Sequence, residues 1–274
     1  MKIDLNLCFP QLKEFIFHEE TIKNASICTV YNYYRDLILF FKYIKSIKKE
    51  TNTNDKIENT DITDIDTKFL SSITYEEIEQ YFFYLKSVKN NNAATRKRRV
   101  ISLRNFFRFL NLTVEVIDSD PTKKLVTPKL NRSLPKFMLE EECIALLNSI
   151  DGTNKERDYC IFVLFINSGI RLSELVGLNY TDIDRQGDVV IRGKGSKERR
   201  IIFNKACLEA LAEYEKFKEI HYQNKERDRD AVFVGRTGKR LTARRIEQIV
   251  KQRITAAGFG GRALSPHKLR HTAA

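Results

Sequence analysis

Four basic residues in three separate stretches of the chain have side chains that could bind an anion together: Arg171, Lys194, His267 and Arg270. All four side chains donate hydrogen bonds, and the three stretches contribute almost no carboxylate that would neutralise them. Such a set suits a phosphodiester, because its negative charge grows in the transition state of cleavage and fixed donors stabilise that charge. The sequence therefore predicts chemistry at a phosphate.

Arg171 is expected at the start of an apolar helix, with Glu174 beside it. Glu174 follows three residues later, lies on the same side of the helix and can hold the guanidinium in one orientation. The apolar residues of this stretch recur at helical spacing and would face a core: Leu172, Leu175, Val176 and Leu178. The simpler alternative is that Arg171 is only the first-turn charge of a surface helix, paired to Glu174.

Lys194 is expected at the glycine-rich tip of a hairpin. Residues 188–192 and 199–203 have the composition of two strands, and residues 193–197 would join them. The tip is not a P-loop, because Asp188 stands where that motif has its first glycine and no long helix follows. A lysine on such a turn is free to swing towards a ligand, although an ordinary solvated lysine fits the same position.

The last stretch is expected to be a short helix with three basic side chains on one face. Ser265 suits an N-cap and Pro266 suits the first helical position. His267, Arg270 and His271 then share a face, because they are three and four residues apart.

Two histidines four residues apart also raise the question of a zinc site. Zinc sites with this spacing normally bring a glutamate between the histidines or a third ligand nearby. Here Lys268 and Arg270 surround the pair with positive charge, which repels a cation. The sequence therefore predicts neither a metal nor another cofactor.

The composition favours a polyanionic partner. The chain of 274 residues has a formal net charge of +12, and its 42% of hydrophobic residues allow a full core. Acidic membrane lipid would also satisfy this charge, but the longest apolar run, residues 160–166, is far too short to span a bilayer. The first residues have no signal-peptide pattern, and the five cysteines form no Cys-x-x-Cys pair, so we expect a cytoplasmic protein with reduced thiols.

The amino-terminal half has the pattern of a helical domain. Helices are expected over residues 10–20 and 26–44, and Thr74 with Glu77 forms a capping box that opens another helix, to Ser87. Residues 48–66 are polar enough to form a surface loop. A chain of this length favours two domains.

A basic helix follows over residues 95–110. Its apolar stripe consists of Val100, Leu103, Phe107 and Leu110. Lys97, Arg104 and Arg108 lie on a different side, so one face can pack while the other follows phosphates, although such a helix can also be merely solvated. In this helix, and in the first turn of a later helix that Thr242 opens, we expect six DNA-contacting residues: Lys97, Arg98, Arg104, Arg108, Arg244 and Arg245.

Prolines and basic residues over residues 118–133 indicate an interdomain linker. After it, helices are expected over residues 140–149, 158–168 and 205–222, and a short strand over residues 231–234. A basic linker suits a protein that closes around its partner as a clamp.

Three motifs in this order resemble the tyrosine recombinase (phage integrase) family, and within it the bacterial Xer branch most. They are GIRLSEL at residues 169–175, GKGSKER at residues 193–199 and SPHKLRH at residues 265–271. Each motif alone is weak, but three in order at suitable spacing are specific. The linker and the basic helix fit as well, so the resemblance covers residues 26–274.

The resemblance implies roles for the basic residues. Arg171 and Arg270 would grip the non-bridging oxygens of the scissile phosphate, Lys194 would protonate the leaving 5′ oxygen, and His267 would help to take the proton from the nucleophile. Two further residues would support these side chains from behind: Glu174 and His271. Members of this family need no metal and no ATP, because a covalent protein–DNA bond conserves the energy of the phosphodiester.

The sequence departs from the family at the nucleophile. In the family a second histidine or tryptophan and then the nucleophilic tyrosine come some tens of residues after the His-x-x-Arg-His motif. Here the last tyrosine is Tyr222, which precedes the motif, and the sequence reaches Ala274. We therefore expect this chain to bind DNA without cleaving it.

The resulting expectation is a mainly α, two-domain, C-shaped DNA clamp with a small β-sheet. It has a helical core-binding domain over residues 1–117, the linker over residues 118–133 and a mixed α/β catalytic domain over residues 134–274. The function implied is site-specific strand exchange on double-stranded DNA through a 3′-phosphotyrosyl intermediate, as a tetramer of this chain or with a related recombinase. A non-catalytic DNA-binding protein with the recombinase fold is the alternative, and a metal-dependent nuclease is a remote third.

Overall fold

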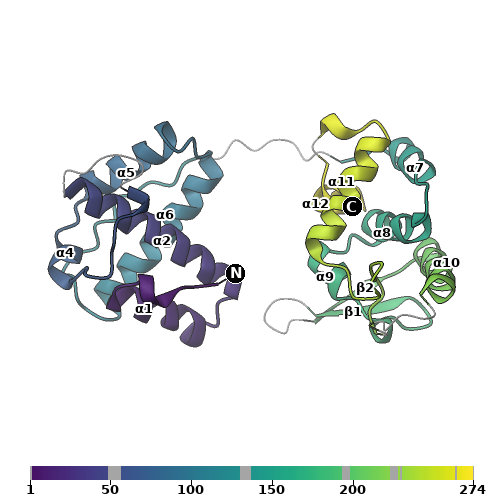
Figure 1. The fold of residues 1–274 in the computed structure, drawn as a ribbon, viewed down its shortest axis with the longest axis horizontal. Coiled ribbons are helices and arrows are strands. Elements are labelled where there is room, and N and C mark those ends of the chain that lie inside the picture. The colour runs from purple at the N-terminus through teal and green to yellow at the C-terminus, as the bar shows by residue number, and fades with distance from the viewer. Residues whose placement is uncertain are drawn as a thin grey trace. The chain divides into compact units, whose positions relative to one another are not determined.

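The structure is a computed structural model that describes residues 2–48, 57–129, 137–192, 198–222, 228, 230–262 and 264–273. The chain forms two compact units, Met1–Arg132 and Ser133–Ala274 (Figure 1). Helices dominate both units, and the expected small sheet lies in the second. Among the described residues no helix is long and apolar enough to cross a membrane.

The amino-terminal unit is a bundle of helices around an aromatic core. Phe15, Phe41 and Phe106 are fully buried and pack edge to face. The elements are η1 (Leu5–Leu7), α1 (Pro10–Phe17), η2 (His18–Ile22), α2 (Ile27–Lys48), α4 (Thr67–Ser71), α5 (Tyr75–Ser87) and α6 (Ala93–Leu112).

Local sequence signals explain where these helices begin. The Thr74 hydroxyl accepts from the Glu77 amide at 3.3 Å and the Glu77 carboxylate accepts from the Thr74 amide at 2.9 Å, so the expected capping box opens α5. The Asn92 side chain caps α6 in a similar way. The predicted stripe of α6 is buried in full and anchors this helix in the core: Val100, Leu103, Phe107 and Leu110.

Two segments predicted to lie on the surface are partly built into the core instead. Within the predicted loop over residues 48–66, Ile57, Ile62 and Ile65 are buried, because three isolated isoleucines suffice to anchor an otherwise polar segment. Within the described part of the predicted linker, Thr122 and Leu125 are buried against the amino-terminal unit. The chain therefore remains packed on the amino-terminal unit as far as Leu125, which lies inside the predicted linker.

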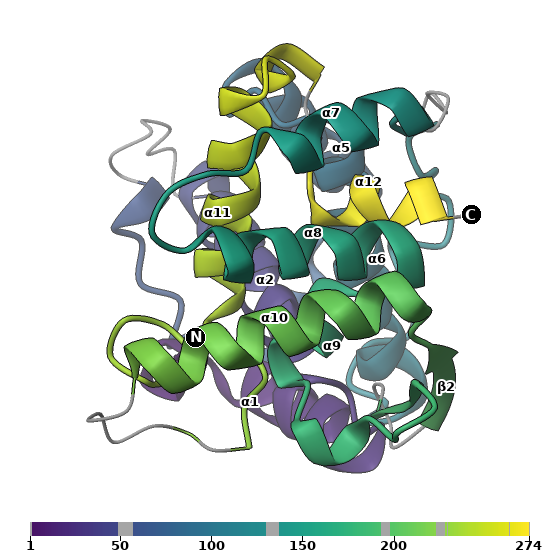
Figure 2. The same ribbon diagram turned by 90° about the vertical axis from the view of Figure 1, so that its right-hand side faces the viewer.

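Helix α8 (Lys155–Ser168) is the centre of the carboxy-terminal unit. The six consecutive residues from Cys160 to Phe165 are all buried. Helices α7 (Glu140–Asn148), α10 (Lys205–His221) and α12 (Pro266–Arg270) pack around α8 (Figure 2). Gly169 ends α8 in the left-handed conformation, with φ of 59°, which glycine adopts without strain. This turn places Arg171 immediately before α9 (Leu172–Gly177).

The two predicted strands form one antiparallel hairpin. Strand β1 (Asp188–Arg192) pairs with β2 (Glu198–Ile202), with Asp188 opposite Ile202 and Ile191 opposite Arg199. The prediction of a strand over residues 231–234 is wrong, because Ala231 and Val234 each form only an isolated β-bridge. That segment is held instead by the buried Lys218 ammonium, which donates to the carbonyls of Ala231 and Val232 at 3.2 and 3.1 Å.

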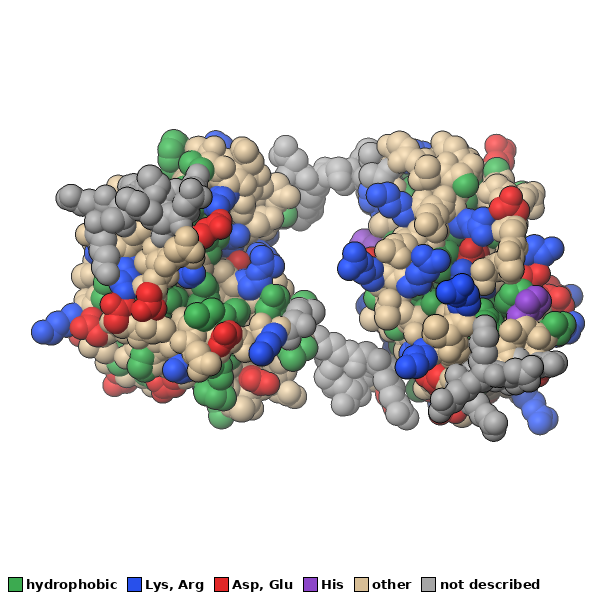
Figure 3. Space-filling view, in the orientation of Figure 1, with side chains coloured by type: hydrophobic (Ala, Val, Ile, Leu, Met, Phe, Trp, Pro, Cys, Tyr) green, Lys and Arg blue, Asp and Glu red, His purple; other side chains and the backbone are tan. Residues whose placement is uncertain are grey.

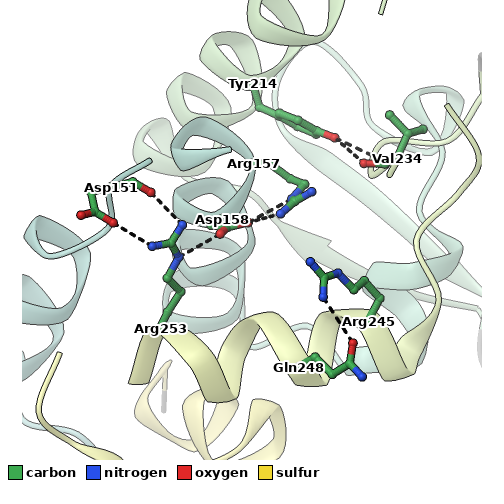
Figure 4. A network of polar contacts seen from close by, with 8 residues as sticks. All are labelled: Asp151, Arg157, Asp158, Tyr214, Val234, Arg245, Gln248 and Arg253. Atoms are coloured by element: carbon green, nitrogen blue, oxygen red, sulfur yellow. Dashed lines mark hydrogen bonds and ion pairs between the residues drawn. The ribbon is translucent and has the colours of Figure 1, made fainter. Parts of the chain in front are cut away.

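A charged network joins α8 to α11 (Ala243–Ala256) (Figure 4). The buried Asp158 carboxylate accepts from Arg157 at 2.7 and 3.0 Å and from Arg253 of α11 at 2.9 Å. Arg253 also donates to Asp151 just before α8. The network fixes α11 on the central helix, and α11 in turn forms one wall of the site described next. The remaining short elements are η3 (Tyr180–Asp182), η4 (Gly260–Arg262) and η5 (His271–Ala273).

Candidate anion-binding site

Three of the predicted site residues meet at one hollow of the carboxy-terminal unit. The hollow has a volume of about 540 Å³ and lies between the α8–α9 connection, the start of α11 and α12. Arg171, His267 and Arg270 line it together with His271 and Glu247. Lys194, the fourth residue of the predicted set, lies outside the described residues.

Arg171 is held in place by the carboxylate of Glu174. The Arg171 guanidinium donates to Glu174 Oε1 at 2.7 Å, and the Arg171 amide donates to Oε2 at 2.7 Å. Arg199 of β2 adds two more bonds, from Nε to Oε1 at 3.1 Å and from Nη2 to Oε2 at 2.7 Å. Glu174 is buried while the Arg171 side chain is 55% exposed. The anchor is therefore inside the protein and the arginine faces outwards.

The protonation state of Glu174 follows from these donors. Burial alone would raise the pKa of this carboxyl group, but the hydrogen bonds from Arg199 and Arg171 outweigh burial and lower the pKa from 4.5 to about 2. Glu174 is thus a carboxylate at any physiological pH.

Arg270 brings an unused donor to the hollow. Its Nη1 is buried and has no hydrogen-bond partner among the described residues. Burial, followed by repulsion from Arg171 and Arg199, lowers the pKa of the Arg270 guanidinium, with Glu174 acting in the opposite direction. A buried donor without a partner is costly, and an anion in the hollow would supply the missing acceptor.

The two histidines form a contact pair. The Nε2 atoms of His267 and His271 are 3.2 Å apart, and the rings meet edge to face. One ring must therefore donate and the other accept, which fixes complementary tautomers. Helix α12 is itself anchored by the buried Pro266 and Leu269, and the Ser265 backbone carbonyl, rather than the predicted side-chain cap, accepts at its first turn.

The basic residues of α6 divide into structural and exposed side chains. Arg98 pairs with the buried Asp36, and Arg104 donates to the carbonyl of Leu125. Both side chains thus have partners within the amino-terminal unit, and their contact with DNA stays a prediction; the Arg98 side chain is still 42% exposed. Arg108 is exposed and Lys97 is half-buried.

The start of α11 has the predicted pair of exposed arginines. The Thr242 hydroxyl accepts from the Arg245 amide and caps the helix, which leaves the side chains of Arg244 and Arg245 at its first turn. Arg245 also contacts Gln248 at 3.3 Å. Lysine and arginine side chains gather on the face of the carboxy-terminal unit that Figure 3 presents.

Arg199 is a residue beside the site that the pattern of the sequence did not reveal, and Glu247 of the hollow was not predicted either. Arg199 was predicted only as the first residue of a strand, and its bond to Glu174 joins residues 25 positions apart. Its place in the GKGSKER motif was a signal that it belongs to the site. The described residues contain no group of three histidine, cysteine, aspartate or glutamate side chains that could hold a metal ion.

Comparison with known proteins identifies the family. Residues 136–274 match the model of the phage integrase family. The tyrosine recombinase XerC of Caldanaerobacter subterraneus subsp. tengcongensis is 37% identical over 265 residues, which cover 97% of this chain and 74% of that protein. XerC of Myxococcus xanthus is 32% identical over 268 residues, covering 96% and 82%. This chain therefore belongs to the phage integrase family of tyrosine recombinases. Within that family, its similarity is to the Xer branch.

Solved structures establish the same fold. The XerH site-specific recombinase bound to a difH substrate matches with a TM-score of 0.67 at 20% identity, covering 96% of this chain and 71% of that one. A lambda integrase dimer bound to a core site matches with a TM-score of 0.63 at 16% identity, covering 96% and 88%. The mainly helical fold with a small sheet is thus confirmed.

Proposed function

We propose that this chain binds double-stranded DNA and supplies the phosphate-binding part of the active site of a site-specific recombinase. The overall reaction cuts and rejoins a strand through a 3′-phosphotyrosyl intermediate. The observation that carries the proposal is the convergence of Arg171, His267 and Arg270 on one hollow from distant parts of the sequence. The DNA-bound recombinases with the same fold support duplex DNA as the ligand.

Each side chain would act on a different part of the phosphodiester. Arg171 and the unused Nη1 of Arg270 would hold the non-bridging oxygens, where charge develops as the bond breaks. His267 would hydrogen-bond the phosphate and take the proton of the attacking hydroxyl, with its tautomer set by His271. Lys194, outside the described residues, would protonate the departing 5′ oxygen.

The attacking hydroxyl is a separate requirement of the reaction. The described residues that line the hollow include no tyrosine, and Tyr222 is buried beside Phe217 at the end of α10. We therefore propose that this chain alone binds DNA without cleaving it. Exposed basic residues outside the hollow, such as Arg108, Arg244 and Arg245, would hold the duplex through its phosphates.

Strand exchange requires four active sites on two duplexes. We propose that copies of this chain, or of this chain and a related recombinase, assemble as a tetramer on DNA. Sedimentation of the protein with a duplex that carries its target site would detect this assembly, and a strictly monomeric complex at saturation would contradict it.

A covalent-adduct assay tests the proposed reaction. The chain would be fused at its carboxy-terminal end to the tyrosine-bearing segment of a tyrosine recombinase and incubated with a nicked target duplex. We expect a protein–DNA adduct that disappears in Arg171→Ala, because the phosphate then loses a bidentate donor. Adducts that survive this substitution would remove Arg171 from the reaction. Sequence-specific binding without any adduct would favour a non-catalytic DNA-binding protein.

A further inference from the structure

Arg199 donates two hydrogen bonds to Glu174, the residue that holds Arg171. Its guanidinium approaches the Glu174 carboxylate side on, with Nε 3.1 Å from Oε1 and Nη2 2.7 Å from Oε2. Two parallel bonds of this kind fix orientation as well as distance, since the planar fork of arginine matches the two carboxylate oxygens. The Arg199 side chain is 34% exposed, whereas that of Glu174 is 4% exposed.

Glu174 is thereby bound on both sides. Each of its oxygens accepts one hydrogen bond from Arg199 and one from Arg171. If Arg199 were absent, the carboxylate would lose half of its donors while remaining buried. It could then rotate or take up a proton, and in both cases Arg171 would lose its fixed partner.

From this geometry we infer that Arg199 is a positioning residue of the anion site, acting on Arg171 through Glu174. The inference rests on the proposed function, because it concerns how the phosphate-binding arginine is oriented. Arg199 also ties β2 to α9, and β2 begins only four residues after Lys194 in the sequence. One contact thus links the strand that follows the hairpin tip to the arginine at the start of α9.

The charge balance of the site agrees with this role. The guanidinium groups of Arg171 and Arg199 bond to the carboxylate of Glu174, and both repel the nearby guanidinium group of Arg270. Arg199 therefore contributes positive potential near the hollow while two of its donor atoms, Nε and Nη2, are engaged by Glu174. Positive charge that is already in place costs no reorganisation when an anion arrives.

The neighbouring Arg200 provides a matched control. It has the same charge and lies in the same strand, opposite Val190, but it is exposed and its side chain points to the other face because adjacent strand residues alternate. Arg199→Met and Arg200→Met thus remove equal charge from the same strand. Only the first removes the contact to Glu174.

The first measurement is a pH titration of the Arg171 backbone amide by NMR. This amide donates to Glu174 Oε2 and therefore reports the protonation of the carboxylate. We expect the midpoint to be near pH 2 in the natural chain and in Arg200→Met, and to lie clearly higher in Arg199→Met. Arg199→Lys should also raise it, because lysine cannot form the paired bonds, and this variant serves if the methionine variant does not fold. An unchanged midpoint in the folded Arg199 variant would overturn the inference.

The second measurement is the adduct assay described above, in the same extended polypeptide. We expect Arg199→Met to slow adduct formation by about 10- to 100-fold relative to Arg200→Met, as expected for a misplaced catalytic group. When Glu174 is already replaced by glutamine, Arg199→Met should slow adduct formation no more than Arg200→Met does, because Arg199 acts through Glu174. If Arg171→Ala abolishes adducts while the Arg199 and Arg200 variants behave alike, the inference fails and the proposed function stands. If Arg171→Ala has no effect, the proposed function itself fails.

Discussion

Replacing Glu174 by glutamine should destabilise the carboxy-terminal unit in a pH-dependent manner. The substitution keeps the shape of the side chain but removes the charge that faces Arg171 and Arg199. In the folded protein the pKa of Glu174 is about 2 instead of 4.5. A difference of about 2.5 pH units corresponds to about 3 kcal/mol of stability, since one unit is worth about 1.4 kcal/mol.

The direction of the pH dependence follows from the lowered pKa. The carboxylate contributes its full stabilisation above its unfolded pKa of 4.5, and the contribution is lost as the pH falls from 4.5 towards 2. Glu174→Gln should therefore be about 3 kcal/mol less stable than the natural chain at pH 7. The two proteins should approach equal stability only as the pH falls below 2, because about half of the Glu174 side chains are still charged at a pH equal to their pKa.

Hydrogen exchange in α8 measures this effect within the correct unit. Amides of Lys155–Ser168 report unfolding of the core around that helix, and their exchange as a function of urea gives the free energy of unfolding. Glu247→Gln is the matched control, because Glu247 is an exposed glutamate of the same hollow. Equal stabilities of Glu174→Gln and the natural chain at pH 7 would refute the reasoning, as would a difference that persists unchanged at pH 2.

Three further predictions concern DNA binding and the charged core. Affinity for duplex DNA should fall steeply between about 50 and 200 mM salt, because lysines and arginines displace counterions from phosphates; a flat response would contradict phosphate contacts. Arg108→Ala should weaken binding to unrelated duplex sequences alike in a titration at low salt, and a loss confined to one sequence would instead indicate base contacts. Asp158→Ala should destabilise the carboxy-terminal unit by about 3–5 kcal/mol in urea unfolding, because the buried Arg157 loses its counter-charge. An unchanged unfolding midpoint would show that the network in Figure 4 is not stabilising.

The elements of the fold were predictable where the signal is local. Helical spacing placed α6 and its buried stripe, the Thr74 capping box placed the start of α5, and strand composition on both sides of a glycine-rich turn placed β1 and β2. These patterns depend on residues within one or two turns of each other. The strand predicted over residues 231–234 failed because pairing requires a neighbouring segment that composition alone does not specify.

The candidate site was predictable in part. The motifs containing Arg171 and His267 were each visible in the sequence, their shared basic character suggested that they converge on an anion, and the family resemblance supported this expectation. The partners of individual arginines were not predictable, because they come from long-range packing. Arg98 contacts Asp36, 62 positions away, and Arg199 contacts Glu174 on another element. A basic residue on a helical wheel therefore has no assigned role until its neighbours are known.

The most direct measurement of the central claim follows the side-chain Nε–Hε signals of Arg171 and Arg270 by NMR while duplex DNA is added at low salt. If these residues together seat a DNA phosphate, both signals should shift, with the same dissociation constant as binding of the whole protein. If the duplex binds and neither signal changes, the hollow between α9, α11 and α12 is not where this protein holds its DNA.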